Sequence, residues 1–390
     1  MNILLFDDIN IKKALLPFTF TRPVCEIRVG INTIAEKWRN ISSNHKISYL
    51  TEPYLAQKYR FVKSDINYLV NGSLFPDANL IEAISKLSLG EGLVKHGVLL
   101  AVCIDFIPFL EGLDTIPSIL QMIDYEQDIT ILRNQWDIFT MNGSQIKVDF
   151  EFISKRTSQQ ISDKHTIVYN PENIFIEEGA KIKAAVLNAE SGPIYIGKNA
   201  EIQEGSIVRG PFALCEGAVI NMGSKMRGDT TIGPYSKVGG EINNSVILGY
   251  SNKAHDGFLG NSVIGEWCNL GADTNTSNLK NNYSNIKVWN YHENDYVDSG
   301  RQFCGLMMGD HSKTGINSMF NTGTVVGVNA NIFGGGYPPK YIPSYAWGGS
   351  EGFQKFDFDK AMQVAAKVME RRNVMMENED YEILRYIYNS

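Results

Sequence analysis

The sequence predicts two unlike structural units, an α/β domain at the N-terminus and a parallel β-helix after it. At 390 residues the chain is longer than a usual domain of about 100–200 residues. Short apolar runs alternate with helix-like stretches before residue 171, whereas aliphatic residues recur at every sixth position after it. The hydrophobic content of 43% is that of a chain that buries a sizeable core.

The N-terminal domain is expected to span residues 1–165. Apolar runs typical of strands occupy residues 3–6, 47–50, 68–70 and 98–103, and helix-like stretches occupy residues 31–38, 53–59 and 79–87. Strands that alternate with helices favour a parallel sheet. Residues 154–170 are polar and poorly patterned, which places the domain boundary there.

A period of six residues governs residues 171–345. Eight aliphatic residues follow one another at this spacing: Ile196, Ile202, Val208, Leu214, Ile220, Met226, Ile232 and Val238. The pattern begins at Ile176 and Ile182, and it resumes at Phe258, Ile264, Leu270 and Thr276 and at Met308, Thr314, Phe320, Val326 and Ile332. The period is not helical, because six is not a multiple of 3.6. One inward apolar side chain per six residues is typical of a solenoid whose stacked coils share a core.

The repeat is interrupted twice. The steps from Val238 to Phe258 and from Thr276 to Met308 are 20 and 32 residues long, and neither is a multiple of six. We therefore expect a loop to leave the solenoid at each place, and the aromatic residues between 278 and 304 indicate an arm or lid. Residues 353–390 are helical by pattern, and we expect them to cap the open end of the solenoid, where strand edges are otherwise unpaired.

Charge and cysteine usage exclude several classes of function. Lys and Arg number 36 against 43 Asp and Glu, and the net charge of −7 disfavours non-specific binding of nucleic acid. The five cysteines are scattered without a C-x-x-C pair, which indicates reduced thiols and no zinc site. No run approaches 18 apolar residues, and the first charges follow the first apolar run instead of preceding it. These patterns predict a cytoplasmic protein without a membrane span or secretion signal.

The stretch from His255 to Asn278 carries a specific motif. A histidine is followed by an aromatic residue three positions later and then by L-G, I-G, Asn, G-A and a second Asn: His255, Phe258, Leu259-Gly260, Ile264-Gly265, Asn269, Gly271-Ala272 and Asn278. This pattern resembles the acetyltransferase half of the bifunctional N-acetylglucosamine-1-phosphate uridylyltransferase/glucosamine-1-phosphate acetyltransferase family. The resemblance implies a left-handed parallel β-helix that forms homotrimers, with active sites between neighbouring coils.

The resemblance also implies roles for individual residues. His255 is the expected general base, and Asn269 is the second expected catalytic residue. The sugar phosphate is expected to contact Lys225, Glu241, Phe258 and Asn278. Acetyl-CoA is the expected acyl donor, with contacts at Ala272, Gly315 and Gly327.

The chemistry of these side chains supports the same reaction independently. Acyl transfer to an amine needs a group that is neutral near pH 7 and accepts a proton, which is what histidine offers. An amide such as that of Asn269 polarises a thioester carbonyl without adding charge. A surface histidine in a turn of the solenoid is the alternative interpretation of His255, and the surrounding motif favours the catalytic one.

Three positions depart from the family pattern. Phe258 stands where the family usually has tyrosine, Asn243 where it has lysine, and Leu279-Lys280 where it has a Tyr-Asp pair. These departures put the acceptor in doubt more than the class of reaction, so the acceptor need not be glucosamine 1-phosphate.

The N-terminal half resembles a second class of enzyme. Leu15-Leu16-Pro17-Phe18-Thr19, followed by Arg22-Pro23, resembles the L-x-P-L-T…P-K segment of sugar-1-phosphate nucleotidyltransferases. Those enzymes hold nucleotide phosphates on the backbone of a glycine-rich loop. Here residues 6–13 contain no glycine, Val24 replaces the lysine, and Ser73 replaces the Asp that would bind Mg²⁺.

Five residues are nevertheless expected to contact substrate in this nucleotidyltransferase-like domain: Arg22, Arg28, Lys37, Asn71 and Gly72. Structural pairing of the three basic residues is the alternative. Mg²⁺ is the expected cofactor if the domain is catalytic, and its ligands stay open. Segments along nearly the whole chain, such as R-G-P-F-A-L-C-E-G at 209–217, resemble a variant, Bacteroidetes-type group of sugar nucleotidyltransferases with these two halves.

Together these patterns predict a transferase of amino-sugar nucleotide metabolism, of the kind that makes UDP-N-acetylglucosamine. The β-helix is expected to acetylate an amino sugar or its phosphate, and the N-terminal domain to bind a sugar phosphate or sugar nucleotide. Neither nucleic acid nor a membrane is an expected partner. Two alternatives stay open: a sugar-1-phosphate nucleotidyltransferase whose β-helix is only structural or regulatory, and a non-catalytic sugar-nucleotide sensor.

Overall fold

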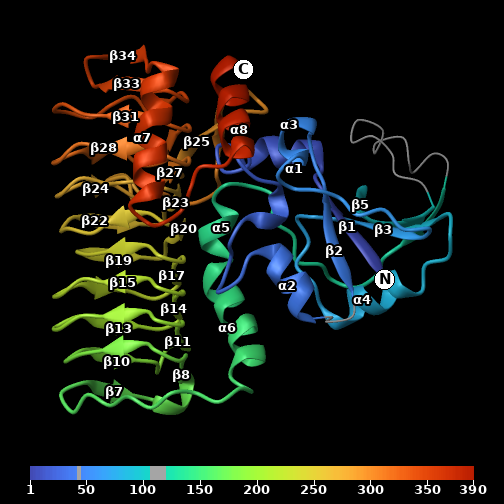
Figure 1. Ribbon diagram of the computed structural model, residues 1–390, viewed down its shortest axis with the longest axis horizontal. Coiled ribbons are helices and arrows are strands. Elements are labelled where there is room, and N and C mark those ends of the chain that lie inside the picture. Colours follow the sequence, from blue (N-terminus) through green and yellow to red (C-terminus); the bar gives the residue numbers. More distant parts are fainter. Residues whose placement is uncertain (42–44, 106–119) are drawn as a thin grey trace.

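The computed structural model describes residues 1–41, 45–105 and 120–390. An α/β domain and a β-helix stand side by side, with the helices α5 (Asp137–Thr140) and α6 (Asn142–Ile153) between them (Figure 1). Two further helices follow the β-helix at the C-terminus. The predicted architecture of an α/β domain, a β-helix and a helical tail is confirmed.

The N-terminal sheet has six strands in the order β2-β1-β3-β5-β4-β6. Their bounds are β1 Asn2–Phe6, β2 Lys46–Leu50, β3 Asn67–Asn71, β4 Glu91–Lys95, β5 Val98–Ile104 and β6 Gln121–Asp124. β1 is parallel to β2 and β3, but β5 is antiparallel to β3 and β4. The expectation of a parallel sheet was therefore wrong in part, because His96 and Gly97, both at positive φ, join β4 to β5 in a two-residue hairpin.

Helices connect these strands: α1 Ile9–Ala14, α2 Ile34–Ile41, α3 Pro53–Ala56 and α4 Ala78–Ser85. α1 begins directly after β1, where Asp8 accepts the backbone N–H groups of Asn10 and Ile11 as an N-cap. This short helix occupies the place of the glycine-rich loop that nucleotidyltransferases have after their first strand.

The β-helix has three sheets, and its chain visits them in turn. The first sheet contains β7 Ile167–Tyr169, β10 Val186–Asn188, β13 Ile207–Arg209, β16 Lys225–Met226, β19 Glu241–Asn243 and β22 Phe258–Gly260, and β24 Asn275–Thr276 and β29 Met319–Phe320 pair beyond them. The second sheet contains β8 Ile174–Ile176, β11 Ile194–Ile196, β14 Phe212–Leu214, β17 Thr230–Ile232, β20 Val246–Gly249, β23 Val263–Glu266, β27 Leu306–Met308, β30 Thr324–Val326 and β32 Tyr341–Ile342. The third sheet contains β9 Lys181–Ile182, β12 Glu201–Ile202, β15 Val219–Ile220, β18 Lys237–Val238 and β21 Asn252–Lys253, and β28 Lys313–Thr314, β31 Asn331–Ile332, β33 Ala346–Gly349 and β34 Gly352–Lys355 pair beyond them.

The inward positions of the coils follow the predicted period of six. All eight residues of the uninterrupted run, from Ile196 to Val238, are at most 1% exposed. The first interruption is not a loop, as was expected, but a shortened corner between the third and first sheets. That corner takes six residues from Ile220 to Met226 and four from Val238 to Ile242. The step from the first sheet to the second also shortens, from six residues between Met226 and Ile232 to five between Ile242 and Ile247. The register therefore shifts by three, and Leu259 rather than Phe258 points inward in the next coil.

The second interruption does leave the solenoid, as expected. Its strands β25 (Lys287–Asn290) and β26 (Asp295–Asp298) form an antiparallel hairpin. The hairpin packs against the N-terminal domain of its own chain, where the rings of Phe20 and Tyr291 meet edge to face at 5.4 Å. Gln135 donates from Nε2 to the carbonyl of Trp289 at 3.0 Å. The arm therefore leaves the β-helix and is fixed by these contacts to the N-terminal domain.

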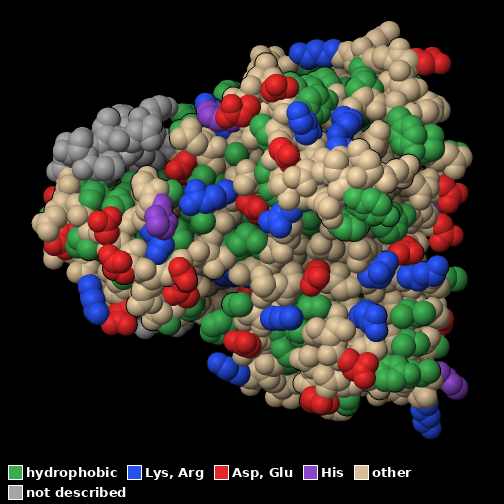
Figure 2. Space-filling view, turned by 180° about the vertical axis from the view of Figure 1, so that it is seen from behind, with side chains coloured by type: hydrophobic (Ala, Val, Ile, Leu, Met, Phe, Trp, Pro, Cys, Tyr) green, Lys and Arg blue, Asp and Glu red, His purple; other side chains and the backbone are tan. Residues whose placement is uncertain are grey.

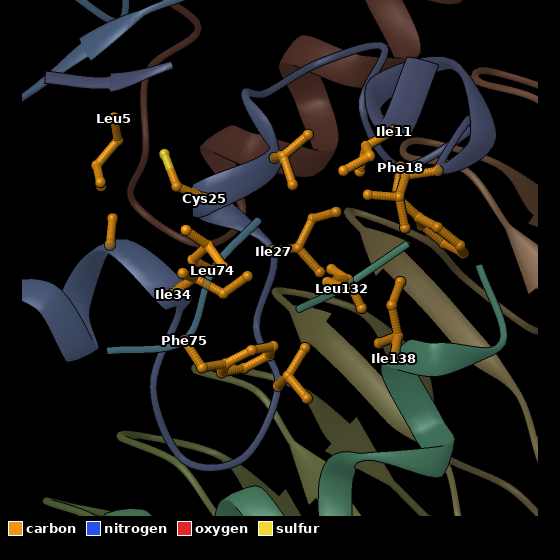
Figure 3. Packing of buried hydrophobic residues seen from close by; sticks show 14 of the residues in the cluster. Leu5, Ile11, Phe18, Cys25, Ile27, Ile34, Leu74, Phe75, Leu132 and Ile138 are labelled. Carbon is orange, nitrogen blue, oxygen red and sulfur yellow. The ribbon is translucent and has the colours of Figure 1, made fainter. Parts of the chain in front are cut away.

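The outer face of the second sheet is covered by the N-terminal domain. Its side chains Val246, Val263 and Val325 belong to the same buried cluster as the core of the α/β domain. Figure 3 shows Ile27, Leu132 and Ile138 of that cluster in front of the β-helix. One continuous core therefore joins the two domains along the second sheet.

The C-terminal helices α7 (Phe358–Glu370) and α8 (Asn378–Asn389) tie the last coils to the N-terminal domain. Tyr345 donates its hydroxyl to the carbonyl of Leu384 at 2.7 Å. On the other side of α8, the rings of Tyr54 and Tyr386 stack at 4.0 Å. The tail thus fixes the last coils to the N-terminal domain, and its role as a cap of the open solenoid end stays a prediction.

The surface seen in Figure 2 carries acidic and basic side chains interspersed, without a patch of one sign. Within the described ranges, no helix has the length and apolar character that a membrane span requires.

Candidate functional site

His255 lies in the turn between β21 and β22, at the corner where the chain passes from the third sheet to the first. Its side chain is exposed, and the described residues offer it no hydrogen bond. The shortened corner at Gly239-Gly240 lies against this turn, since a Cβ on Gly240 would approach the backbone of Asp256 and Gly257. His255 is therefore open to solvent at this corner of the solenoid.

Three of the predicted acceptor-binding residues stand in one row beside this turn. Lys225 pairs in register with Glu241, and Glu241 pairs with Phe258, on consecutive strands of the first sheet. Lys225 is exposed, and the side chains of Glu241 and Phe258 are half-buried. We call the row Lys225–Glu241–Phe258 the acceptor strip. It offers an ammonium, an aromatic edge and a carboxylate on the strands next to His255, and the carboxylate of Glu241 lies 3.3 Å from Nη1 of Arg227.

Asn278, the fourth predicted acceptor-binding residue, joins the upper end of the acceptor strip. A Cβ on Gly260 would lie 2.5 Å from Cζ of Phe258 and 2.7 Å from Nδ2 of Asn278. The glycine therefore lets Phe258 and Asn278 approach each other. Asn278 donates from Nδ2 to Oδ1 of Asn261 at 2.7 Å, which fixes its amide.

Asn269 lies around the corner on the third sheet. It is exposed and bridges Asn252 of the coil below and Lys313 of the coil above. Asn252 donates from Nδ2 to Asn269 Oδ1 at 3.3 Å and accepts from Arg372 at 2.7 Å. The end of α7 thus reaches the same face as Asn269. The structure separates Asn269 from the acceptor strip by one corner of the solenoid.

The three predicted acetyl-CoA contacts fall in two places. Ala272 lies in the turn directly above that of His255, where Asp273 donates its N–H to the carbonyl of Asp256 at 3.1 Å. Gly315 follows one coil higher at the same corner. Gly327 lies at the corner between the second and third sheets, where Ser312 donates to its carbonyl at 2.7 Å. The structure therefore brings Ala272 and Gly315 to the His255 corner but not Gly327.

Two exposed apolar residues at this corner escaped the sequence reasoning. Met222 and Ile316 are each 70% exposed, in turns below and above His255. Neither occupies an inward position of the repeat, so the period of six gave no signal for them.

Arg22, a predicted substrate contact, is instead buried between the two domains. Its Nη2 lies 2.5 Å from Asp310 Oδ2 and 3.1 Å from Glu266 Oε2, both in the β-helix. Burial alone would raise the pKa of the Asp310 carboxyl, but Arg22 beside it holds that pKa below its usual value. A phosphate would have to displace these carboxylates, so Arg22 acts as a link between domains.

Arg28 and Lys37 are also paired. Arg28 donates to the carbonyl of Ile31 and lies 3.3 Å from Glu36. Lys37 is 6% exposed and forms an ion pair with Asp149 of α6, and burial lowers the pKa of its ammonium although Asp149 opposes this effect. The alternative of structural pairing, which the sequence left open, describes these contacts.

Lys37 also lines a cavity of roughly 500 Å³ between the N-terminal domain and the first coils. Phe75 and Asp77 come from the loop after β3, and Tyr195 comes from β11. The cavity joins apolar surface to a few polar groups, which is typical of a small-molecule site.

Asn71 and Gly72 lie at the end of β3 and form hydrogen bonds within the N-terminal domain. Asn71 Oδ1 accepts the hydroxyl of Ser73 at 2.6 Å, and Gly72 donates its N–H to the carbonyl of Phe6 at 2.8 Å. At the end of β1, Lys12 Nζ lies 3.3 Å from Asp7 and 2.6 Å from Glu52. This edge of the sheet, where nucleotidyltransferases hold phosphate, is closed by an ion-pair cluster.

No set of side chains that would bind Mg²⁺ is evident among the described residues. The parts of the chain that the structure describes contain no group of three or more His, Cys, Asp or Glu side chains that could hold a metal ion. Ser73, in place of the expected Asp, offers only a hydroxyl. The described residues therefore show no preformed site for the ion, and no step is assigned to it.

Comparison with known proteins places these features in context. Residues 3–158 match the family model of sugar nucleotidyl transferases. A bifunctional sugar-1-phosphate nucleotidylyltransferase/acetyltransferase of Sulfurisphaera tokodaii is 33% identical over 162 residues, which are 41% of this chain and 38% of the relative. The bifunctional protein GlmU of Methanococcus aeolicus is 38% identical over 92 residues, 24% of this chain and 22% of the relative.

A cyanobacterial GlmU, from Synechococcus elongatus, is 24% identical over 225 residues, 52% of this chain and 45% of the relative. The chain thus spans less than half the length of these relatives. A solved Arabidopsis UDP-N-acetylglucosamine acyltransferase aligns with 55% of this chain and 77% of its own at 15% identity, with a TM-score of 0.19. Residues 3–158 match the sugar nucleotidyl transferase family, and the predicted resemblance of the chain to bifunctional nucleotidylyltransferase/acetyltransferases is confirmed.

Proposed function

We propose that the β-helix transfers an acetyl group from acetyl-CoA to the amino group of a sugar or sugar phosphate, with His255 as general base. The observation that carries the proposal is the acceptor strip in register beside an exposed histidine. Lys225 provides a cation for a phosphate, and Glu241 provides an acceptor for sugar hydroxyls. The names of the bifunctional relatives support the same pair of activities.

The chemistry needs few groups. The acceptor nitrogen attacks the thioester carbonyl carbon while the imidazole of His255 takes the proton from that nitrogen. The carbon–sulfur bond then breaks, and the proton passes to the departing thiolate. An amide such as Asn269 stabilises the oxyanion that forms at the carbonyl oxygen. Ala272 and Gly315 are the proposed neighbours of the pantetheine chain, because they line the corner above His255.

The proposed assembly is a homotrimer. Met222 and Ile316 expose apolar side chains on either side of His255, and a neighbouring subunit would bury both. The second sheet is not available for this contact, since the N-terminal domain covers it. The partner would then complete the site at the His255 corner.

For the N-terminal domain we propose binding of the sugar phosphate or sugar nucleotide, in a pathway of the UDP-N-acetylglucosamine type. The cavity beside Lys37 is the proposed place for this ligand. Nucleotidyl transfer is the second candidate function, and the match of residues 3–158 to nucleotidyl transferases favours it. The ion pairs that close the end of β1 favour binding without nucleotidyl transfer.

The test is thiol release from acetyl-CoA by the wild-type chain, with a panel of amino-sugar phosphates and UDP-amino sugars as acceptors. The proposal expects release that depends on one class of acceptor. Pyrophosphate is measured in parallel, with nucleoside triphosphate and sugar 1-phosphate supplied. Formation of pyrophosphate without thiol release would refute acetyl transfer in favour of nucleotidyl transfer. Ligand binding without either product would indicate a non-catalytic sensor.

A further inference from the structure

One lysine lies inside the solenoid. Lys253 stacks in register on Val238, which stacks on Ile220 and Ile202, in the inward column of the third sheet. Lys253 is 2% exposed, although the coils below fill this position with aliphatic side chains. None of the coils below has a lysine at this position. Packing alone therefore does not explain why Lys253 is there.

The ammonium of Lys253 is directed to the backbone of the His255 turn. Its Nζ donates to the carbonyl of His255 at 2.6 Å and to the carbonyl of Asp256 at 2.9 Å. Both distances are those of charge-assisted hydrogen bonds. One side chain thereby anchors two successive peptide groups of the turn that carries the proposed base.

Burial of this charge opposes folding. It lowers the pKa of the Lys253 ammonium to about 8, even though the carboxylates of Asp256 and Asp273 act in the opposite direction. His255 is the remaining titratable group of the turn. An apolar side chain of similar length would fill the same space without this penalty. Sites that need precise geometry keep such residues at the expense of stability.

We propose that Lys253 is a positioning residue that holds the backbone of His255 in place beside the acceptor strip. The proposal rests on the proposed acetyl transfer. In it, Lys253 touches neither the acceptor nor the thioester, and it acts only through the turn. Loss of the two hydrogen bonds would leave the turn free to move, and displacement of a catalytic group by about 1 Å lowers rates on the order of a hundredfold.

The decisive variant is Lys253→Met, with Lys237→Met as its matched control. Lys237 belongs to the strand below, but its side chain is exposed on the outer face. We expect Lys253→Met to lower kcat by about tenfold to a hundredfold, to leave the KM for acetyl-CoA unchanged, and to leave Tm unchanged or raised. The control should change none of these. A lower Tm with an unchanged kcat would show that Lys253 is merely structural.

The pH profile offers a second, independent reading. The wild-type rate should fall above about pH 8, as the ammonium loses the charge that strengthens its two hydrogen bonds. Lys253→Met has no such group and should lose this alkaline limb. An alkaline limb that persists unchanged in the variant would overturn the proposal.

A measurement without substrate separates the two proposals. His255 is one of six histidines, so its imidazole signal in a ¹³C-histidine spectrum is assigned with His255→Ala. We expect Lys253→Met to shift or broaden that signal and to spare the other five. An unmoved signal refutes the positioning role, whereas wild-type protein that releases no thiol refutes the acetyl transfer alone.

Discussion

The N-terminal domain and the His255 corner use charged side chains in opposite ways. In the domain, Lys12, Arg22 and Lys37 are each less than a tenth exposed, and each is paired with a carboxylate. At the corner, His255 and Lys225 are exposed, and neither has an ion-pair partner among the described residues, whereas the neighbouring Glu241 pairs with Arg227 at 3.3 Å. Paired buried charges fix one part of a chain against another, whereas open charges are available to a ligand. We infer that the first set fixes the structure, with Arg22 acting across the two domains and Lys12 and Lys37 within the N-terminal one. The second set is the one we propose for the chemistry.

The largest effect should come from breaking the link between the domains. Asp310→Asn leaves the buried Arg22 facing an amide in place of its closest carboxylate, and we expect a loss of about 3–5 kcal/mol in the free energy of unfolding. Urea denaturation measures it. Lys86→Met, which removes an exposed i,i+4 pair with Glu82, is the control and should change stability by less than about 0.5 kcal/mol. Equal effects of the two variants would abolish the contrast between buried and open charges.

A pH dependence of stability should follow from His311, at the same junction. Burial lowers the pKa of this imidazole to about 3, with Lys313 acting in the same direction and Asp310 against it. The unfolded chain takes up the proton near pH 6.5, so stability is lost as the pH falls below that value, by about 2 kcal/mol at pH 5. His311→Leu should flatten the dependence between pH 7 and pH 5 in urea denaturation. An equally steep dependence in the variant would remove His311 as its source.

The acceptor strip should show a smaller, kinetic effect. Lys225→Ala and Glu241→Gln each remove one predicted contact to the sugar phosphate, and we expect the acceptor KM to rise about tenfold, or about 1.4 kcal/mol. The KM for acetyl-CoA should not change. Lys181→Ala, which removes an exposed lysine from the third sheet, is the control. If the control matches Lys225→Ala, the strip has no special role.

The smallest effect is expected at the aromatic position of the strip. Phe258→Tyr restores the hydroxyl that the resembling family usually has. Since a single new hydrogen bond contributes about 0.5–1.5 kcal/mol, the ratio of kcat/KM between two acceptors should change several-fold. Identical ratios in wild type and variant would place Phe258 outside the acceptor contact.

Much of the fold was readable from the sequence, because the β-helix repeats one local rule. A residue such as Ile220 is inward for the same reason as Ile202, eighteen positions earlier. The rule failed at Phe258, because the Gly239-Gly240 corner is two residues shorter, and the step from Ile242 to Ile247 one residue shorter, than in the coil below. A fixed period cannot register such deletions. It also gave no role to Lys253, which breaks the aliphatic column just after those deletions.

Contacts between distant parts of the chain were not readable. Arg22 and Asp310 are 288 positions apart, and no local pattern joins them. The helix α6 was also missed, because its sequence includes Gly143 and lacks a clear apolar period, and contacts with the β-helix stabilise it instead. There, a Cβ on Gly143 would collide with Asp229, so the glycine reflects close approach to the next domain.

The central claim is that the exposed corner carries the reaction, and His255→Ala tests it most directly. With acetyl-CoA and the best acceptor of the panel, we expect the variant to release thiol about 10²–10⁴ times more slowly than wild type, at an unchanged Tm. His165→Ala, at an exposed histidine beside the first coil, should keep the wild-type rate. A folded His255→Ala variant that releases thiol as fast as wild type would contradict the account.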